Sequence, residues 1–442
     1  MMVFLNVGGL PGLCGNSIYY PNCLLRNLCE ARALLTGLAA MNVVAIRPQP
    51  IVARSLRASD RRIARVEIFD DLTLAEPHWR ALEQVDSLAT PYQYYDFLKH
   101  WQRHVGSNSS MTPFIVVGFN EQSEPLFLLP LGSRPLGGLI GLEFLGGKHA
   151  NFNMALWRRD VAATIGADGL RSVLSTLSGH ADVLKLVNQP LTWGGATNPF
   201  ALLPHQRAAN YGFSGALVPD FDALLRARSN SEARKKMRKK ERALASFGDL
   251  RFERATEPDD VRRVIDAFFK QKSARMRALG MSDAFSLPGV RRFIEAAATE
   301  QLVDGKPLIE LYALSVDDII VATMGGIVGG GRFCAMFNSI IQGRFAAESP
   351  GEQLILKLVR SCCERELLTF DLGIGEARYK NLLCGDAEPL FDSYIPLSAG
   401  GRLPAITFAL GAITKRAIKT QPALWSIVGA LRRLRARLSV VP

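Results

Sequence analysis

Four side chains that can move a proton or hold a charge lie within ten residues of one another: Asp371, Glu376, Tyr379 and Lys380. Glu376 stands three residues before Tyr379 and four before Lys380, so one turn of a helix would carry all three on one face. Carboxylate, phenol and amine groups are those that general acid and base catalysis uses. This stretch is therefore where the sequence places a candidate active site.

Two local elements would position these side chains. The apolar run at residues 367–370 (Leu-Leu-Thr-Phe) predicts a short buried strand. Gly373 and Gly375 follow it, and glycine permits backbone angles and close ligand approach that a Cβ resists. A strand, a glycine turn and a helix start form the place where α/β enzymes usually keep their sites.

A second helix start lies immediately upstream, at Ser349-Pro350-Gly351-Glu352. It precedes apolar residues at helical spacing from Leu354 to Cys362, which predicts a helix with Ser349 as cap and proline in its first turn. Free amides at such a start can bind phosphate. Two strand-like runs, 319–328 and 333–341, come before it on either side of Gly329-Gly330-Gly331. The order predicted from residue 308 is three strands, a helix, a strand, a glycine turn with a helix, and a strand.

This order and its motifs resemble the GNAT acyltransferases, in particular the CelD-type branch associated with cellulose biosynthesis. That branch carries a Ser-Pro-Gly helix start followed by Phe-Asp-Phe-Gly-x-Gly-Asp-x-x-Tyr-Lys. The matching positions are Ser349, Pro350, Gly351, Phe370, Asp371, Gly373, Gly375, Tyr379 and Lys380. Leu372 stands where the family usually has Phe, and Glu376 where it has Asp.

The resemblance extends over about residues 65–400 and is strongest after residue 230. It implies an α/β fold with mixed sheets, in which two tandem GNAT-like domains related to the Fem-type transferases are joined by a basic helix. The expected boundaries are a disordered leader at 1–64, a first domain at 65–221, a second, acyl-CoA-binding domain at 222–400, and a basic amphipathic tail at 401–442.

The resemblance also implies a cofactor and roles for residues. Acetyl-CoA or another acyl-CoA would be the co-substrate, with its pantetheine arm between the strand ending near Ile341 and the strand at 367–371. The implied cofactor-binding residues are Ser349, Gly351, Glu352, Gly373 and Gly375. Tyr379 would donate a proton to the departing thiolate, Asp371 or Glu376 would serve as base or substrate anchor, and Lys380 would hold negative charge. The alternative for these residues is structural: Asp371 as a turn cap, and Glu376 with Lys380 as an ordinary helix-surface ion pair.

A polar glycine loop at residues 144–153 supplies a further set of candidates. His149, Asn151 and Asn153 are expected to bind substrate if a two-domain enzyme turns this loop toward its inter-domain site. The alternative is that the loop serves only as a turn.

The formal net charge of +12 is unevenly distributed. Residues 1–65 carry +6, residues 225–242 carry +7 and residues 401–442 carry +8, which leaves −9 for the rest of the chain. A specific nucleic-acid-binding face over the folded body is therefore not expected. Residues 222–247 are expected to form one long basic helix, either a solvated connector or a wall that attracts an anionic substrate or the CoA 3′-phosphate.

The tail alternates apolar residues with eight Lys and Arg and contains no acid. It predicts basic amphipathic helices that either lie on an anionic membrane surface or pack on the body. Because no apolar run reaches the length of a membrane-spanning helix and no basic signal-like start is present, the expected location is the cytoplasm, with peripheral contact at the inner face of the membrane.

Seven cysteines occur at irregular spacing without a Cys-x-x-Cys pair. This predicts buried thiols in a reducing compartment and no zinc site. His100 and His104 lie four residues apart on an expected helix, but no third ligand stands near them, so aromatic packing is the preferred interpretation.

The function expected from the sequence is therefore acyl-CoA-dependent N-acyl transfer, in particular acetyl transfer, to a small-molecule or saccharide acceptor. A link to cellulose or another exopolysaccharide is implied by the family resemblance. The alternatives are a Fem-like transferase that uses aminoacyl-tRNA, and a non-catalytic GNAT-like module that assembles with a polysaccharide synthase.

Overall fold

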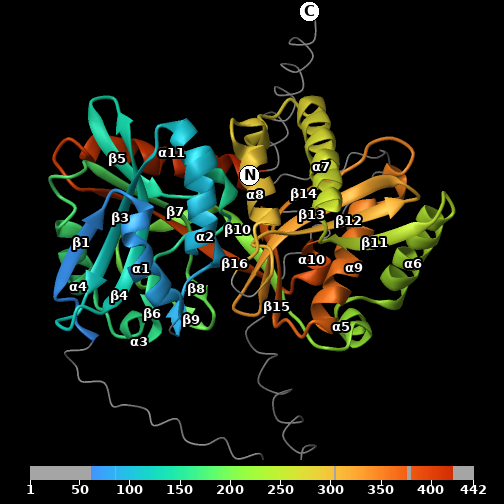
Figure 1. Ribbon diagram of the computed structural model, residues 1–442, viewed down its shortest axis with the longest axis horizontal. Coiled ribbons are helices and arrows are strands. Elements are labelled where there is room, and N and C mark those ends of the chain that lie inside the picture. Colours follow the sequence, from blue (N-terminus) through green and yellow to red (C-terminus); the bar gives the residue numbers. More distant parts are fainter. Residues whose placement is uncertain (1–60, 85, 303–304, 376–379, 422–442) are drawn as a thin grey trace, which may run out of the picture. The chain divides into compact units, whose positions relative to one another are not determined.

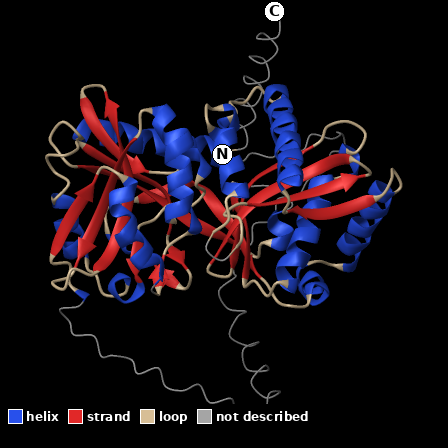
Figure 2. Ribbon diagram, viewed as in Figure 1, coloured by secondary structure: helices blue, strands red, loops and turns tan. Residues whose placement is uncertain are grey.

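The computed structural model describes residues 61–84, 86–302, 305–375 and 380–421. These residues form one mixed sheet of fourteen strands and a separate two-stranded ribbon (Figures 1 and 2). The main path of the sheet runs β1 (Arg65–Phe69), β3 (Thr112–Phe119), β4 (Pro125–Leu136), β5 (Leu139–Phe144), β7 (Val183–Pro190), β16 (Asp386–Pro396), β10 (Gln206–Ala216), β15 (Thr369–Ile374), β14 (Arg332–Ile340), β13 (Ile319–Gly329), β12 (Glu310–Val316) and β11 (Leu250–Ala255). β6 (Leu156–Arg158) pairs with β4 and with β2 (Ser87–Leu88), while β8 (Thr192–Trp193) and β9 (Ala196–Thr197) form the ribbon.

Helices cover both faces of this sheet. The described α-helices are α1 (Leu72–Gln84), α2 (Tyr95–Trp101), α3 (Arg159–Ala162), α4 (Ala167–Ser175), α5 (Phe221–Arg228), α6 (Ser231–Ala245), α7 (Pro258–Ala278), α8 (Val290–Thr299), α9 (Pro350–Glu364), α10 (Lys380–Leu383) and α11 (Arg402–Thr420). Short 3-10 or π turns, η3 to η9, lie at Pro91–Gln93, Gln102–Gly106, Ser107–Ser109, Gly147–His149, Pro199–Leu202, Ala284–Ser286 and Ala346–Glu348.

The second half of the sheet separates two apolar cores, and the alternation of side chains along β12 shows how. Leu311 and Ala313 point into the core that includes α7 and α8. Tyr312 and Leu314 point into the core that includes α6 and α9. Successive side chains of a strand face opposite sides of a sheet, so α7 and α8 cover one face and α9 covers the other.

The predicted order from residue 308 is confirmed. β12, β13 and β14 are followed by α9, β15, the two glycines, α10 and β16. In the first half, β3 and β4 form an antiparallel hairpin. The fold is a mixed α/β fold with one large mixed sheet.

Strand pairing crosses the predicted boundary between residues 221 and 222. β10, from the predicted first domain, lies between β15 and β16 of the predicted second domain. β16 in turn pairs with β7 of the first half. The boundaries themselves stay a prediction, and the predicted leader lies outside the described residues as far as residue 60.

The prediction of one long helix over 222–247 is wrong in one respect, because the segment forms two helices, α5 and α6. Ser229 is extended, with φ −141°, and the Asn230 side chain accepts a hydrogen bond of 2.8 Å from the Ala233 amide. Short polar side chains favour such caps over helix interiors, so a Ser-Asn pair ends one helix and starts the next.

The first part of the predicted basic tail packs on the body. α11 lies against β16, β10 and β7, and the Gln206 side chain donates to the Ala409 carbonyl over 3.2 Å.

No α-helix in the described part of the chain is both long enough and apolar enough to cross a membrane. The described cysteines are free and buried, as predicted: Cys334, Cys362, Cys363 and Cys384.

Candidate functional site

β14 and β15 run parallel for only three residue pairs, from Arg332↔Thr369 to Cys334↔Asp371. β14 then continues to Ile340 while β15 continues to Ile374, with no further pairing between them. β14 stays paired with β13 on its other side, through a bulge opposite Gly325 and Gly326. The two strands therefore part at their carboxyl ends, and beyond the parting the edge of β14 that faced β15 has lost its partner strand.

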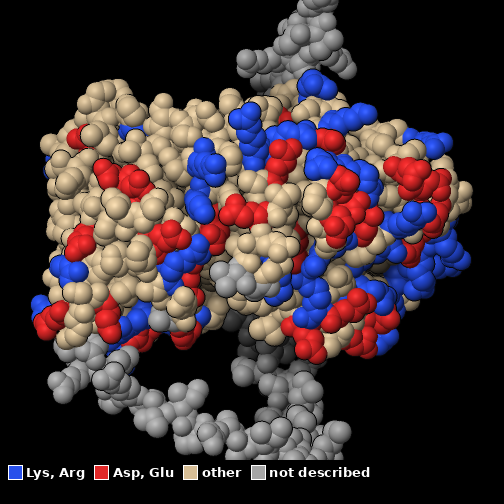
Figure 3. All heavy atoms as spheres, viewed as in Figure 1, with Lys and Arg blue, Asp and Glu red and all other residues tan. Residues whose placement is uncertain are grey.

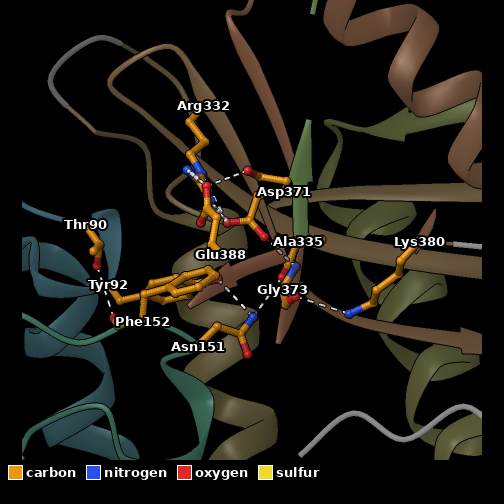
Figure 4. Close-up of polar contacts among 11 residues, drawn as sticks. Thr90, Tyr92, Asn151, Phe152, Arg332, Ala335, Asp371, Gly373, Lys380 and Glu388 are labelled. Carbon is orange, nitrogen blue, oxygen red and sulfur yellow. Dashed lines mark hydrogen bonds and ion pairs between the residues drawn. The ribbon is translucent and has the colours of Figure 1, made fainter. Parts of the chain in front are cut away.

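Asn151, from the first half of the chain, reaches the start of this parting. Its side-chain amide donates to the Ala335 carbonyl over 2.9 Å and to the Tyr92 hydroxyl over 3.2 Å (Figure 4). Gly373 lies opposite with φ +72°, and a Cβ there would lie 2.7 Å from the Asn151 amide nitrogen. Only glycine fits this position, which explains one glycine of the predicted turn.

Asp371 lies fully buried beside the parting in an ion cluster. Its Oδ2 accepts from Arg332 over 2.6 Å, and the same guanidinium contacts Glu388 over 2.8 Å. The Asp371 Oδ1 accepts from the Gly373 amide over 2.5 Å. Burial raises the pKa of Asp371, and the charge of Arg332 opposes that rise. The carboxylate thus ties β14 to the glycine turn.

The aromatic ring of Trp193 covers this cluster from the β8–β9 ribbon. The Arg332 guanidinium lies 4.0 Å from the centre of that ring, within the range of a cation–π contact. Ser214 on β10 donates to Glu388 over 2.5 Å. Side chains from both halves of the chain therefore fix the paired ends of β14 and β15, where the two strands begin to diverge.

Lys380 is almost completely buried under the glycine turn. Its ammonium donates to the carbonyls of Gly373 and Ile374 over 3.2 Å each. Burial lowers the pKa of Lys380 to about 8. The lysine therefore holds the turn that leads into residues 376–379.

Glu376 and Tyr379 lie outside the described residues. The flanking residues are described: Gly375 has φ +91°, and its amide donates to the Tyr211 carbonyl over 3.0 Å. The structure brings together Asp371, Gly373, Gly375 and Lys380 of the predicted set, around the end of β15.

The start of α9 forms the second part of the candidate site. Gly351 lies against Ile340 at the end of β14, since a Cβ on it would lie 2.5 Å from the Ile340 Cδ1. Ser349 occupies the N-cap position, but with φ +52° its side chain caps no amide, so the predicted capping role is wrong. Its hydroxyl instead accepts from Lys240 of α6 over 2.7 Å, and Lys240 also contacts Glu352 over 3.0 Å. A cation from the basic helix thus stands at this helix start.

Two further residues on β14 and α7 were missed by the sequence analysis. Lys272 is buried, and its ammonium donates to the Asn338 carbonyl over 3.3 Å, beyond the parting. Burial lowers the pKa of Lys272 to about 8. The Asn338 side chain is also buried, and its Oδ1 has no hydrogen-bond partner among the described residues. The sequence does contain a sign that Lys272 is buried, because it lies four residues after Phe268 on the apolar face of α7.

The three predicted substrate residues of the first half lie in different surroundings. Asn151 reaches the parting, as described above. The neutral ring of His149 accepts from Trp101 over 3.1 Å, while its Nε2 lies 3.3 Å from the Ala284 carbonyl, and burial lowers its pKa to about 4. Asn153 donates to the Val187 carbonyl over 3.0 Å. Hydrogen bonds within the protein therefore explain why polar side chains occupy these two buried positions.

No group of three His, Cys, Asp or Glu side chains placed to hold a metal ion occurs within the described ranges. Lys and Arg gather over the part of the molecule that α6 occupies (Figure 3). The exposed cations of α6 are Lys235, Lys236, Arg238, Lys239 and Arg242.

Residues 231–381 match the sequence family described as acetyltransferase (GNAT) domain. This segment begins with α6 and contains the parting, the start of α9 and the glycine turn. The mixed α/β fold of this segment is GNAT-like. No curated protein matches the chain at a significant level.

Several solved structures share part of the arrangement at low sequence identity. FemX is 10% identical, with 74% of this chain and 96% of that chain covered and a TM-score of 0.47. L-PGS from Bacillus licheniformis is 10% identical, with 75% and 95% covered and a TM-score of 0.44. A tandem GNAT protein from the clavulanic acid biosynthesis pathway is 12% identical, with 76% and 99% covered and a TM-score of 0.42.

Proposed function

We propose that this chain is an acyl-CoA-dependent N-acyltransferase that uses acetyl-CoA or a longer acyl-CoA. The observation that carries the proposal is the parting of β14 and β15 beside the start of α9, within the segment that matches the acetyltransferase domain. The match supports the class of reaction, and the geometry supports the position of the donor.

The residues at the parting have the chemistry that a pantetheine arm and a pyrophosphate require. The arm carries amide N–H groups, and the buried Asn338 Oδ1 is an acceptor that lacks a partner in the described chain. Asn338 lies two residues from Ile340, hence on the same face of β14, and Ile340 packs at Gly351. At the start of α9 the Glu352 and Gln353 amides already donate to the Ser349 carbonyl, so the groups proposed to meet phosphate are the Gly351 amide and the Lys240 ammonium. We propose that one acyl-CoA molecule contacts both parts, with its pantetheine arm near Asn338 and its pyrophosphate at the start of α9.

Acyl-CoA supplies an activated thioester, and the protein must hold it, accept a proton from the amine and protonate the departing thiolate. We assign proton donation to Tyr379. The contacts of Asp371 favour a positioning role, because Arg332 and the Gly373 amide occupy its oxygens. This leaves Glu376 as the acid proposed to act as base or substrate anchor. Lys380 is proposed to fix the turn before them, and its pKa of about 8 lets it exchange a proton near neutral pH.

A small-molecule amine or a saccharide is the proposed acceptor, and a role in cellulose or exopolysaccharide formation follows from the family resemblance alone. Aminoacyl-tRNA is the main rival donor, because the exposed cations of α6 would suit a long polyanion. A non-catalytic module for a polysaccharide synthase would keep the fold and lose the chemistry.

Isothermal calorimetry with acetyl-CoA, longer acyl-CoA and aminoacyl-tRNA separates these functions. We expect acyl-CoA to bind with a dissociation constant in the range of about 1 μM to 1 mM, typical of substrates. A folded protein that binds aminoacyl-tRNA and no acyl-CoA would replace the proposal with the rival. A protein that binds neither would point to the non-catalytic module. Turnover is then measured over a panel of amines, amino sugars and polysaccharide precursors.

A further inference from the structure

The outward face of α11 carries a stripe of exposed aliphatic side chains. Successive members are three or four residues apart, so they share one side of the helix. The side chains and their exposed fractions are Leu403 72%, Ile406 56%, Leu410 58% and Ile413 53%. Large aliphatic residues at regular spacing on a solvent-facing helix surface indicate an interaction site.

The opposite face of α11 already has its partner, which is the sheet. Ala405 is buried there, and the ring of Phe408 lies 5.4 Å from the Lys185 ammonium of β7. Lys419, near the end of the helix, contacts the Asn210 side chain of β10. The helix is thus fixed on the body by one face, and none of the described residues buries the stripe on the other face.

α11 carries cations and no acid. Arg402 and Lys415 are exposed on α11. Residues 401–442 contain eight Lys and Arg and no Asp or Glu. A long cationic side chain can keep its charge in water while its methylene stem lies along apolar surface.

The positive charge of this segment favours one kind of binding partner for the stripe. A second copy of the chain docked through the same face would bring two sets of cations together without an acid between them. Residues 422–442, folded back over the stripe, would do the same, because four of the eight cations lie in that segment. An anionic lipid surface offers apolar acyl chains to the stripe and negative headgroups to the cations.

We propose that α11 docks the protein on an anionic lipid bilayer, with the stripe Leu403, Ile406, Leu410 and Ile413 inserted at the boundary of headgroups and acyl chains. The helix lies in the plane of the surface and does not cross the bilayer. The docking is independent of the acyl-transfer proposal, since none of these residues belongs to the parting or to the start of α9.

A matched pair of leucines tests the proposal on the full chain. Leu410→Glu places a carboxylate in the stripe, and Leu74→Glu places one on α1, where the leucine is exposed by 61% against 58% for Leu410. Both sites are exposed on helices, so both variants should fold, which thermal unfolding verifies. Binding is measured by co-sedimentation with vesicles of phosphatidylglycerol mixed with phosphatidylcholine, and with phosphatidylcholine alone.

We expect binding to the anionic vesicles, little binding to phosphatidylcholine, and weakening when the salt rises above about 0.15 M. Leu410→Glu should bind the anionic vesicles at least about tenfold more weakly, and Leu74→Glu should bind like wild type. Wild-type affinity in Leu410→Glu would overturn the proposal, as would equal binding to both kinds of vesicle. A dimer in analytical ultracentrifugation that Leu410→Glu dissociates, without vesicle binding, would assign the stripe to a second copy instead.

Discussion

Each half of the sheet contains one parallel strand pair that lasts for three residue pairs, β5 with β7 and β14 with β15. In the first half the chain itself bonds β7 beyond the last pair, Glu143↔Lys185. The Asn153 amide donates to the Asn188 carbonyl over 3.1 Å, and its side chain donates to the Val187 carbonyl. In the second half the Asn338 Oδ1 stays without a partner in the described residues. Asn151 and Lys272 likewise donate to the Ala335 and Asn338 carbonyls of β14. Within the described residues each half also keeps one buried amide oxygen without a partner, since Gln189 Oε1 on β7 has none either. We assign donor binding to the second pair because it lies beside the start of α9, within the segment that matches the acetyltransferase domain.

Each parallel pair also carries an ion cluster, and the two clusters differ in burial. Glu143 on β5 contacts Arg134 and Lys185, whose side chains are 44% and 34% exposed. Arg332 on β14 is 12% exposed and contacts Asp371, which is fully buried. Exposed ion pairs stabilise a protein little, whereas removing one partner of a buried pair leaves an uncompensated charge. Substitutions in the ion cluster where β14 and β15 diverge should therefore lower the free energy of unfolding more than those in the first half.

The largest expected effect follows from that difference. Arg332→Met would leave the charges of Asp371 and Glu388 without their cation and should lower the free energy of unfolding by about 3–5 kcal/mol. Arg134→Met, in the first half, should change it by less than about 1 kcal/mol. Urea unfolding of both variants measures the contrast. Equal losses would show that the two clusters do the same work.

The next effect is a pH dependence that the second half alone should show. The pKa of Lys380 falls from an ordinary 10.5 to about 8 in the folded protein because of burial. Between these pH values the unfolded chain binds more protons than the folded one, so stability rises with pH across this window, by about 3 kcal/mol for one such group. Below pH 8 both states are protonated and the burial cost is present in full.

Lys380→Met should therefore show a smaller rise in unfolding free energy between about pH 8 and pH 10 than wild type. Lys235→Met, which removes an exposed lysine of α6, serves as control and should rise like wild type. Lys272 is buried with the same pKa and should account for a rise that survives in Lys380→Met. Parallel curves for wild type and Lys380→Met would mean that the lysine is hydrated in solution.

The third effect is on turnover, because the proposed proton donor lies in the second half of the chain. Tyr379→Phe should lower turnover by about a hundredfold or more and leave acyl-CoA affinity nearly unchanged, since general acid catalysis supplies about 10² to 10⁴. The control is Tyr394→Phe, which loses only a hydroxyl that donates to Asp392 over 3.3 Å on β16. Full turnover in Tyr379→Phe would make this tyrosine structural and direct the search for the acid to the Asn151 loop.

The sequence predicted local elements well and pairings poorly. The order of strands and helices after residue 308 followed from apolar runs and the glycines at 329–331, which are local signals. The position of β10 between β15 and β16 did not follow from the sequence, because the residues of an apolar strand do not indicate which distant strands pair with it. For the same reason the buried partner of Asp371 was missed, although Arg332 stands alone at the head of an apolar run.

The candidate site shows the same division. The glycine at position 373 predicts close approach of another group, and Asn151 does approach it, but no local pattern identifies Asn151 as that group. The position of Ser349 before Pro350 predicts a cap, whereas its hydroxyl accepts a hydrogen bond from Lys240, 109 residues earlier in the chain. Long-range contacts redirected side chains whose local pattern was correctly identified.

The smallest effect concerns phosphate at the start of α9, and it needs a substitution that spares the packing. Gly351→Asp would add a carboxylate there, but its Cβ would also meet Ile340 at 2.5 Å, so lost binding would not separate charge from disrupted packing. Lys240→Gln removes only the cation that contacts Ser349 and Glu352.

The same two helices offer the control for this change. Lys357 of α9 contacts Glu241 of α6 over 2.6 Å, so Lys357→Gln breaks an equivalent pair away from the helix start. Lys240→Gln should weaken acyl-CoA binding by about threefold to tenfold, because one charge-assisted contact to phosphate is lost and Glu352 is left without its cation. Dephospho-CoA, which lacks the 3′-phosphate, decides which phosphate is involved. A loss that persists with dephospho-CoA assigns Lys240 to the pyrophosphate, a loss that disappears assigns it to the 3′-phosphate, and equal affinities in Lys240→Gln and Lys357→Gln would remove the start of α9 from the donor site.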